Sequence, residues 1–540
     1  MLIDRRLLLK GAVLGAGVLA LPAWAQVLGR RGFTHDVASG EPGPDRVMLW
    51  TRYLPEPGAS GRLRWQVARD AEFGTVVAHG ETEAAPERDW CVKPIATGLD
   101  PGGWYFYRFL NGVGQPSPIG RTRTLPDGPA GKFTLGVFSC SNLPFGHFNA
   151  YAHAAARSDI DLMVHLGDYI YEYPVGTYPS LEQAIPGRLI EPATEILALA
   201  DYRLRYASYR SDPDLQRLHR MFPMVMMWDD HETANNSWIG GAQNHQPETE
   251  GDWNVRKAAI LQAYREWMPI SDTPWTSYRI GDLADLFRPE TRLTGRDKQF
   301  EVSEILSGKP DRATALADFR DGPWLEPARS LLGMEQERWL ADSLRRSTGD
   351  KVKWQVLCQQ VIMGSLSFPP EIVTVVGGNM TDSLRQRAEL AVAQSQAGLP
   401  MNLDMWDGYP AARNRLLGSS QEAGANLIVL SGDSHNAWGF ELPQAGAPAG
   451  AEFAVHSVTS PGNESSIPAD PAAVARAYVG GNEQLKWAET SRRGYLTVEL
   501  TPERATGEWV FMDTVRQPSL AIAARHAMHV AHGTNRFAGA

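Results

Sequence analysis

The sequence predicts an α/β protein preceded by a small β-sandwich, and three observations support this fold class. Residues 33–124 hold short, aromatic-rich runs that alternate in polarity and are separated by Pro/Gly turns. From Lys132 onward, strand-like apolar runs alternate with long segments of helical spacing. Several apolar runs end directly in ionisable side chains, as in "MVMMWDDHE" at residues 224–232. Because an unpaired buried charge is very costly, such strand ends either face solvent or serve a site.

Composition and charge narrow the class of protein. The 540 residues are 43% hydrophobic and 21% charged, which is ordinary for a soluble globular chain of two or three domains. The net charge is −10, and no block of basic residues stands out. The sequence therefore predicts no nucleic-acid-binding patch.

The N-terminus is expected to be an export signal at residues 1–25 rather than part of the fold. Two arginines, Arg5 and Arg6, precede an apolar run from Gly11 to Ala23 that closes on an A-x-A-type cleavage site. The run is shorter than the roughly 20 apolar residues that span a membrane, so no stable membrane anchor is expected. The arginine pair resembles a twin-arginine signal, although a Sec signal with an incidental arginine pair is the alternative. A twin-arginine signal implies passage through the twin-arginine translocation machinery and a periplasmic or secreted protein.

The cysteine count argues against a disulfide framework. Three cysteines cannot all pair with one another, so at least one thiol is free. Cys358 lies inside the apolar run "WQVLCQQ" and Cys91 lies in the β-rich segment, so both are expected to be buried structural residues. Cys140, which follows a strand, is the cysteine that could serve as a ligand.

The first folded unit is expected over residues 33–124. Its runs "DRVMLWTRY", "GRLRWQVARD", "TVVAHGETEA" and "GWYFYRFL" are typical of a fibronectin- or immunoglobulin-like sandwich. The segment "PDGPAGK" at residues 126–132 has the composition of a linker.

The second unit is expected over residues 132–540. Alternation of strands and helices predicts an α/β domain in which helices cover both faces of the sheet. Near the C-terminus three histidines recur at spacing three, and a solvated helix end is favoured there over a metal-binding tract. His165, inside an apolar run, is expected to be a core residue. The expected strands are "FTLGVFSC", "DLMVHLGD", "PMVMMWDD", "KWQVLCQQ", "NLIVLSGD" and "EFAVHSVTS", and the expected helices are "TEILALADYRLRYASYR", "NVRKAAILQAYREWM" and "MEQERWLADSLRRS".

Four of these strands carry ligand-type residues at their carboxyl ends. In α/β sheets the functional crevice lies outside these ends, so the residues are expected to meet there. A single strand that ends in such residues would be read as an ordinary turn, whereas four such strands together indicate a functional site. They are Cys140; Asp168 and Tyr171; Asp229, Asp230 and His231; and Asp433 and His435.

The residue types at these ends suit a metal centre. Carboxylates packed in one crevice repel one another, and their pKa values rise unless cations neutralise them. Asp168 could bridge two ions through its two oxygens, and a paired metal site supports in-line attack of an activated water on phosphorus. His231 lies beside Asp230, where it could protonate a leaving oxygen.

The same motifs resemble those of the purple-acid-phosphatase-like metallophosphoesterases. "GDYIY" at residues 167–171 matches G-D-x-x-Y, "DDHE" stands where that superfamily has G-N-H-E, and "SGDSH" stands where it has G-H-x-H. Cys140 stands where an aspartate is usual. This set of replacements, with "FTHDVASGEPGPDRVMLWTR" and "MWDGYPAARNRLL", resembles the PhoD-type alkaline phosphatase/phosphodiesterase family over nearly the whole chain. The resemblance implies a β-sandwich, then a four-layer α-β-β-α domain whose site holds Fe(III) and Ca²⁺.

The resemblance also implies a role for each matching residue. The expected activity is hydrolysis of phosphomonoesters and/or phosphodiesters by a metal-activated water, with His231 as proton donor. Trp228 and Asn236 would lie near the substrate or a further calcium ion. The implied iron ligands are Cys140, Asp168, Tyr171 and His435, and the implied calcium ligands are Asp168, Asp230 and Asp433.

Two other functions remain open from the sequence. The segment "GDSHN" is similar to the motif of Gly-Asp-Ser esterases, in which Ser434 would be the nucleophile. A non-catalytic, calcium-dependent binding protein would explain the acidic strand ends, but it would leave Tyr171 and His231 without a role.

Overall fold

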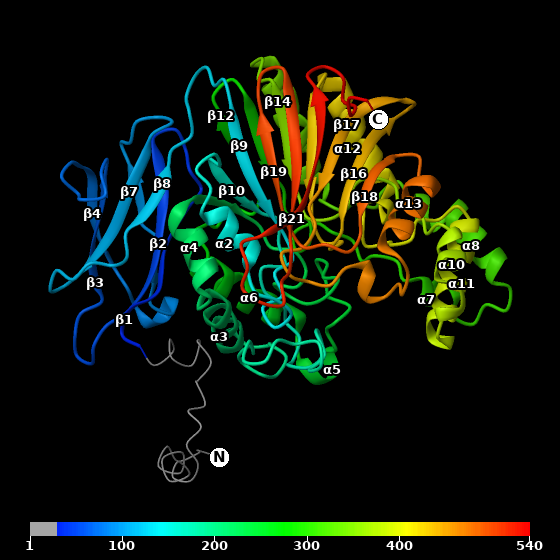
Figure 1. The fold of residues 1–540 in the computed structure, drawn as a ribbon, viewed down its shortest axis with the longest axis horizontal. Coiled ribbons are helices and arrows are strands. Elements are labelled where there is room, and N and C mark those ends of the chain that lie inside the picture. The colour runs from blue at the N-terminus through cyan, green and yellow to red at the C-terminus, as the bar shows by residue number, and fades with distance from the viewer. Residues whose placement is uncertain (1–29, 540) are drawn as a thin grey trace, which may run out of the picture.

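The computed structural model describes residues 30–539 (Figure 1). The predicted export signal at residues 1–25 lies outside these described residues. Within them, no helix is both long enough and apolar enough to cross a membrane.

Two large β-sheets pack face to face at the centre of the molecule. The first has ten strands in the order β21-β20-β19-β9-β10-β11-β1-β2-β5, with β6 beside β2. Its strands are β1 (Gly32–Gly40), β2 (Arg46–Leu54), β5 (Cys91–Val92), β6 (Ile95–Thr97), β9 (Phe133–Phe138), β10 (Leu162–His165), β11 (Pro223–Met226), β19 (Gly494–Leu500), β20 (Arg504–Met512) and β21 (Ile522–Ala531).

The second sheet has seven strands in the order β12-β13-β14-β15-β17-β16-β18. In its centre β13, β14, β15 and β17 run parallel, so their carboxyl ends meet at one edge. The strands are β12 (Thr276–Ile280), β13 (Ala284–Arg288), β14 (Trp354–Cys358), β15 (Leu427–Ser431), β16 (Ala437–Gln444), β17 (Ala447–Ala454) and β18 (Leu485–Glu489).

Helices cover the outer face of each sheet, which confirms the expected four layers (Figure 1). α2 (Asn149–Ala155), α3 (Leu199–Arg210), α4 (Pro213–Met221) and α6 (Trp253–Trp267) lie on the ten-stranded sheet. α9 (Met334–Gly349) and α12 (Pro410–Ala423) lie on the seven-stranded sheet. The remaining helices are α5 (Pro247–Glu250), α7 (Val302–Leu306), α8 (Arg312–Asp321), α10 (Glu371–Val376), α11 (Asp382–Gln396) and α13 (Pro471–Gly481).

The alternation of strand side chains explains why β11 is apolar on both faces. Val225 and Met227 belong to the core between the two sheets, whereas Met224 and Met226 belong to the core under the helices. A strand that is covered on both faces has no position for a polar side chain until it ends. The ionisable residues of "DDHE" therefore begin where the strand leaves the core.

The N-terminal strands form the predicted sandwich, and one of its sheets continues into the second domain. The other sheet has the order β4-β3-β7-β8, with β3 (Arg62–Ala68), β4 (Val76–Glu83), β7 (Trp104–Asn111) and β8 (Gly120–Arg123). A core that includes Val37, Leu49 and Val67 separates the two sheets. Ser39 and Gly40 of β1 pair in parallel with Pro223 and Met224 of β11. The two domains therefore share one hydrogen-bonded sheet.

The expectation of a helix near the C-terminus is wrong. His526 and His529 lie on strand β21, the edge of the ten-stranded sheet, and His526 stacks on Trp487 with ring centroids 4.1 Å apart. A spacing of three places side chains on opposite faces of a strand, so these histidines cannot share an ion. The expectation for His165 is confirmed, since it is buried and its Nε2 lies 2.8 Å from the Tyr151 hydroxyl.

Candidate metal centre

Loops at the carboxyl ends of four strands bring the predicted site residues together. Cys140 follows β9, Asp168 follows β10, Asp230 follows β11, and Asp433 and His435 follow β15. Cys140, Asp168, Asp433 and His435 adopt φ between 54° and 63°, in the left-handed region that non-glycine residues seldom occupy. Such backbone strain clusters at functional sites, where the surrounding structure holds it in place.

Asp168 connects three groups of possible ligands. Donor atoms of Cys140, Asp168 and His435 lie within 4.8 Å of one another. The same limit holds for Asp168 with Asp230 and His231, and for Asp168 with Asp229, Asp230 and Asp433. The Oδ1 atom of Asp168 is buried and has no hydrogen-bond partner among the described residues. A buried carboxylate oxygen normally has a partner, so this atom fits a cation ligand.

Tyr171 lies beside the first of these groups. Its hydroxyl lies 3.1 Å from Asp168 Oδ2, 3.4 Å from His435 Nε2 and 2.6 Å from Ser460 Oγ. The phenol, the thiol of Cys140, the carboxylate and the imidazole therefore face a common point from three different loops.

His435 is held in the form that binds metals. Its Nδ1 lies 2.7 Å from the carbonyl oxygen of Pro461, which can only accept, so Nδ1 carries the proton. This leaves the lone pair of Nε2 directed at Asp168, whose Oδ2 lies 3.9 Å away. Burial lowers the pKa of His435 to about 4, so the imidazole is neutral at physiological pH.

The protonation of the other donors indicates that the centre needs cations. Burial, and then repulsion by Asp230 and other carboxylates, raises the pKa of Asp433 to about 8, although Arg292 opposes the shift. Burial and the charge of Asp168 raise the pKa values of the Cys140 thiol and the Tyr171 phenol well above their ordinary values. Thiolate and phenolate ligands would therefore form only beside an ion that favours the deprotonated forms.

His231 forms a dyad with Glu172. Its Nδ1 lies 2.7 Å from Glu172 Oε2, and the other oxygen of this buried carboxylate accepts hydrogen bonds from Asn235 N at 2.8 Å and Asn244 Nδ2 at 3.0 Å. The other ring nitrogen, Nε2, is thereby left free to interact with a molecule in the cleft. Burial opposes the charged imidazolium, but Asp230, Glu172 and Asp168 outweigh it and raise the pKa of His231 well above its ordinary value.

The remaining members of "DDHE" hold the site together. Glu232 accepts hydrogen bonds from the backbone N–H groups of Asp168 at 3.0 Å, Tyr169 at 2.6 Å and Asp229 at 2.8 Å. One carboxylate thus fixes the loop after β10 to the loop after β11. Asp229 lies 2.5 Å from Nε of the fully buried Arg292.

A cleft of about 250 Å³ opens onto these groups. No lysine or arginine is among the described residues that line it. Asn236 lines the cleft, whereas Trp228 does not. Trp228, two residues after β11, packs in the core under the helices and donates its indole N–H to Glu290 at 2.8 Å. The lining residues are Asp230, His231, Asn235, Asn236, Leu366, Met401, Asn402, Asp404, Met405, Asp433, Ser434, His435, Asn436, Trp438 and Asn463.

Ser434 lacks the surroundings of a nucleophile. Its hydroxyl accepts a hydrogen bond from Trp438 Nε1 at 2.9 Å and donates to the carbonyl of Asn436 at 3.4 Å. Within residues 30–539 it forms no hydrogen bond with an imidazole. A serine esterase needs such a base beside its serine, so this geometry argues against the esterase alternative.

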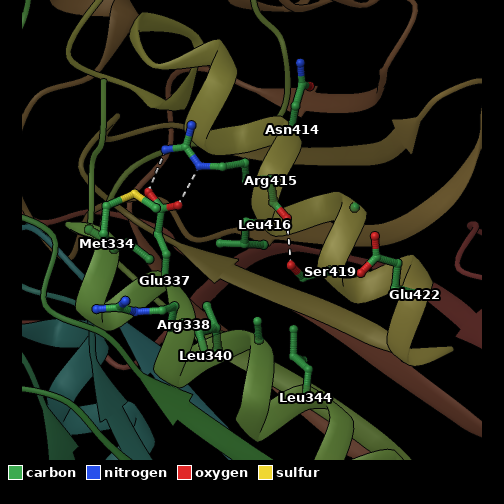
Figure 2. A pocket seen from close by; sticks show the side chains of 13 residues that line it. Met334, Glu337, Arg338, Leu340, Leu344, Asn414, Arg415, Leu416, Ser419 and Glu422 are labelled. Atoms are coloured by element: carbon green, nitrogen blue, oxygen red, sulfur yellow. Dashed lines mark hydrogen bonds and ion pairs between the residues drawn. The ribbon is translucent and has the colours of Figure 1, made fainter. Parts of the chain in front are cut away.

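A second hollow lies on the outside of the seven-stranded sheet, between α9 and α12 (Figure 2). Its floor contains Leu340 and Leu344, and Arg415 forms two short contacts with Glu337, at 2.7 and 2.8 Å. None of the predicted site residues lines it, and its best-placed carboxylate is already paired. It therefore offers no ligand set comparable to the metal centre.

Sequence reasoning missed four residues that support the site. Glu172 directly follows the "GDYIY" motif, so its position was a usable signal. Glu232 ends "DDHE", but nothing in the motif indicates that it accepts backbone N–H groups. Arg292 and Asp404 lie far along the chain in segments with no local pattern, and only the tertiary structure brings them to the site.

Comparison with known families agrees with this geometry. Residues 135–509 match the family model described as "PhoD-like phosphatase", and residues 20–126 match "PhoD-like phosphatase, N-terminal domain". The chain is 33% identical over 511 residues to "Alkaline phosphatase D" of Bacillus subtilis (strain 168), which covers 91% of this chain and 80% of that relative.

Solved structures give the same result. A structure described as "Structure of PhoD" superposes with a TM-score of 0.74 at 30% identity, covering 93% of this chain and 91% of that chain. Purple acid phosphatase PPD1 from yellow lupin (Lupinus luteus) seeds has a TM-score of 0.52 at 11% identity, covering 92% of this chain and 74% of that chain, which shows a shared fold. The chain therefore belongs to the PhoD-like phosphatase family.

Proposed function

We propose that this phosphatase hydrolyses phosphomonoesters and/or phosphodiesters with a metal-activated water, at a centre that holds Fe(III) and Ca²⁺. The observation that carries the proposal is Asp168. Its carboxylate belongs both to the group with Cys140 and His435 and to the group with Asp230 and Asp433, and its Oδ1 is buried with no hydrogen-bond partner among residues 30–539. A carboxylate in this position can bridge two ions. Paired ions, when bound, supply the charge that activates a water and stabilises the phosphoryl oxygens.

The two ligand groups suit different ions. Cys140, Tyr171 and His435 offer a thiol, a phenol and a neutral imidazole beside Asp168, a set that fits iron(III) better than calcium. Asp230 and Asp433 offer only oxygen, which is the donor that calcium prefers. We assign the first group and Asp168 to iron, and the second group and Asp168 to calcium.

In the proposed reaction His231 is the proton donor. Glu172 fixes its ring through Nδ1, so a proton on Nε2 faces the cleft, where it can pass to the leaving oxygen of the ester. The raised pKa of His231 favours the protonated form that this step needs. Asn236, which lines the cleft, is proposed to contact the substrate.

The cleft lining favours one charge class of substrate. Beyond the metal centre its walls contain five asparagines and the apolar side chains of Leu366, Met401, Met405 and Trp438. Apart from the proton donor His231, no cationic side chain is among the described lining residues, so a substituent carrying a second negative charge gains no further partner there. We propose that esters with an uncharged leaving group are preferred.

We also propose export through the twin-arginine machinery to the periplasm or the exterior. The support is the sequence of residues 1–25, with Arg5-Arg6 before a short apolar run. Fusing residues 1–29 to a reporter that functions only outside the cytoplasm, with Arg5 and Arg6 replaced by lysine as control, tests this route.

Metal analysis and visible absorption of the purified protein test the metal assignment. Iron(III) with phenolate and thiolate ligands gives a ligand-to-metal charge-transfer band, so the protein should be coloured. Tyr171→Phe should shift or bleach the band, and Cys140→Ser should change it differently. A colourless, fully active protein that contains zinc and no iron would overturn the iron assignment but not the two-metal reaction.

A variant of Ser434 separates the phosphoesterase from the esterase alternative. Ser434→Ala should retain activity on a chromogenic phosphoester within about threefold, whereas Asp433→Ala and His435→Ala should abolish it. A chelator should also abolish it. An inactive Ser434→Ala protein whose wild type resists chelators would instead support a serine nucleophile.

A further inference from the structure

We infer that Arg292 is a resident cation of the metal centre, a positioning residue whose fixed charge takes the place of a further ion among the carboxylates. The inference rests on the proposed function, since it assumes that the carboxylates bind cations. Arg292 is fully buried beside carboxyl groups and does not line the cleft.

Arg292 crosses from one sheet to the other. It lies in the loop after β13, on the seven-stranded sheet, and its Nε reaches Asp229 Oδ1 at the end of β11, on the ten-stranded sheet, at 2.5 Å. Nη1 reaches Asp404 Oδ2 at 2.7 Å, and the backbone N–H of Arg292 donates to Glu290 Oε1 at 2.8 Å. Two edges of the planar guanidinium and its backbone are therefore fixed.

The third edge of the guanidinium faces the proposed calcium ligands. Nη2 lies 3.9 Å from Asp230 Oδ1 and 3.7 Å from Asp433 Oδ1. This nitrogen is buried and has no hydrogen-bond partner among the described residues. It is too far from either carboxylate for a hydrogen bond, but close enough for a strong charge interaction in a buried site.

The charges of the cluster explain why a fixed cation is needed. Asp168, Asp229, Asp230, Asp404 and Asp433 converge in a buried region. Among the residues that the structure describes, the two guanidinium groups that contact them belong to Arg292 and to Arg296, which lies 2.6 Å from Asp404. Without Arg292, Asp229 would lose its partner and Asp230 and Asp433 would lose their nearest fixed cation. A bound divalent ion could supply the missing charge.

This role predicts a specific link between calcium and stability. The unfolding temperature of Arg292→Met should fall by about 5 °C or more in a chelator, as expected when one partner of a buried ion pair is removed. Saturating calcium should recover at least half of that loss. Magnesium and zinc are tested in parallel, because the ion that enters the cluster is identified by which one stabilises the protein.

Arg288→Met is the matched control. Arg288 is also a buried arginine, at the end of β13, and it contacts Glu41 at 3.4 Å and two backbone carbonyls outside the acidic cluster. The fall in unfolding temperature caused by Arg288→Met should be the same with and without calcium. An Arg292→Met loss that is equally insensitive to all three ions would show an ordinary packing role and overturn the inference.

Arg292→Lys separates charge from packing and decides the case if Arg292→Met does not fold. Lysine keeps the positive charge but loses the planar, branched guanidinium. The unfolding temperature of Arg292→Lys in a chelator should therefore fall by no more than about half as much as that of Arg292→Met. If Arg292→Met does not fold, the metal-free lysine variant should still be folded. A lysine variant that fails as completely as the methionine variant would overturn the inference. Turnover of a phosphoester by wild type is measured separately, so failure of the proposed function is distinguishable from failure of this inference.

Discussion

At the scale of single residues, the proposed reaction depends on how one imidazole is held. His231 is fixed through Nδ1 by Glu172, and the rings of Tyr171 and Tyr173 flank it with centroids 4.5 and 5.3 Å away. The ring therefore has one free nitrogen and little freedom to turn. A proton on that nitrogen is presented to the cleft in a fixed direction.

His231→Ala should lower kcat by about 10²–10⁴-fold on an ester with an alkoxide leaving group, the usual contribution of a general acid. The loss should be smaller with nitrophenolate, which needs little protonation to leave. Rates on both substrates, with metal content measured in parallel, check the prediction. An activity within threefold of wild type on the alkoxide ester, with metals retained, would contradict the role.

Glu172→Gln should change the pH profile. Glu172 is one of the carboxylates that raise the pKa of His231, and a general acid works only below its pKa. Removing the charge of Glu172 lowers that pKa, so the alkaline fall in kcat should move toward lower pH, by about one unit for about 1.4 kcal/mol of lost interaction. Asn244→Ala, which removes a hydrogen-bond donor to Glu172 but no charge, is the control and should leave the fall within about half a unit.

At the scale of the elements, one carboxylate joins the ends of two strands. Glu232 holds the loop after β10 and the loop after β11 through three backbone N–H groups. The geometry of Asp168 therefore depends on a residue that neither binds substrate nor is expected to bind metal.

Glu232→Gln should destabilise the protein by about 1–3 kcal/mol, because the amide cannot accept from all three buried donors. It should also lower metal occupancy, since the loop that carries Asp168 loses its fixed position. Urea unfolding and metal analysis measure the two effects. Glu499→Gln, a strand glutamate paired with Lys132 near the surface, should change neither quantity appreciably.

The element scale also shows what sequence could predict. Strands β9, β10, β11, β14 and β15 were predictable because continuous apolar runs end abruptly at polar residues, and α6 and α9 because their apolar spacing is helical. Strand β21 was not predictable, because its sequence "IAARHAMHVA" mixes alanine and methionine with histidines at a spacing that a helix also permits. Motif residues predicted the cleft, whereas the pairing of Arg292 with Asp404, 112 positions apart, has no local signal.

At the scale of the whole molecule, the sandwich is a structural part of the catalytic domain. β1 fills the position beside β11, and Trp50 of β2 donates its indole N–H to the carbonyl of Glu266 in α6 at 2.8 Å. The strand whose end carries "DDHE" thus gains its second neighbour from the N-terminal domain.

Gly40→Ala should destabilise both domains together. A Cβ at Gly40 would lie 2.2 Å from the carbonyl oxygen of Pro269 and 2.9 Å from that of Met224, and backbone atoms cannot easily move away. The expected loss is about 1–3 kcal/mol, with a single unfolding transition in calorimetry. Gly112→Ala, where a Cβ would meet nothing within 4 Å, should be near neutral. Two separate transitions, with only the sandwich affected, would contradict the shared sheet.

The pairing of β1 with β11 has a consequence for the order of synthesis. Ser39 must wait for Pro223, its partner across the shared sheet, to be translated. At about 5–20 residues per second, that wait lasts roughly ten to forty seconds. During this time the edge of β1 is an open template for other chains. β1 and β11 cannot pair until nearly half of the polypeptide has left the ribosome, so protection of the first strands by a chaperone should raise the yield of folded enzyme.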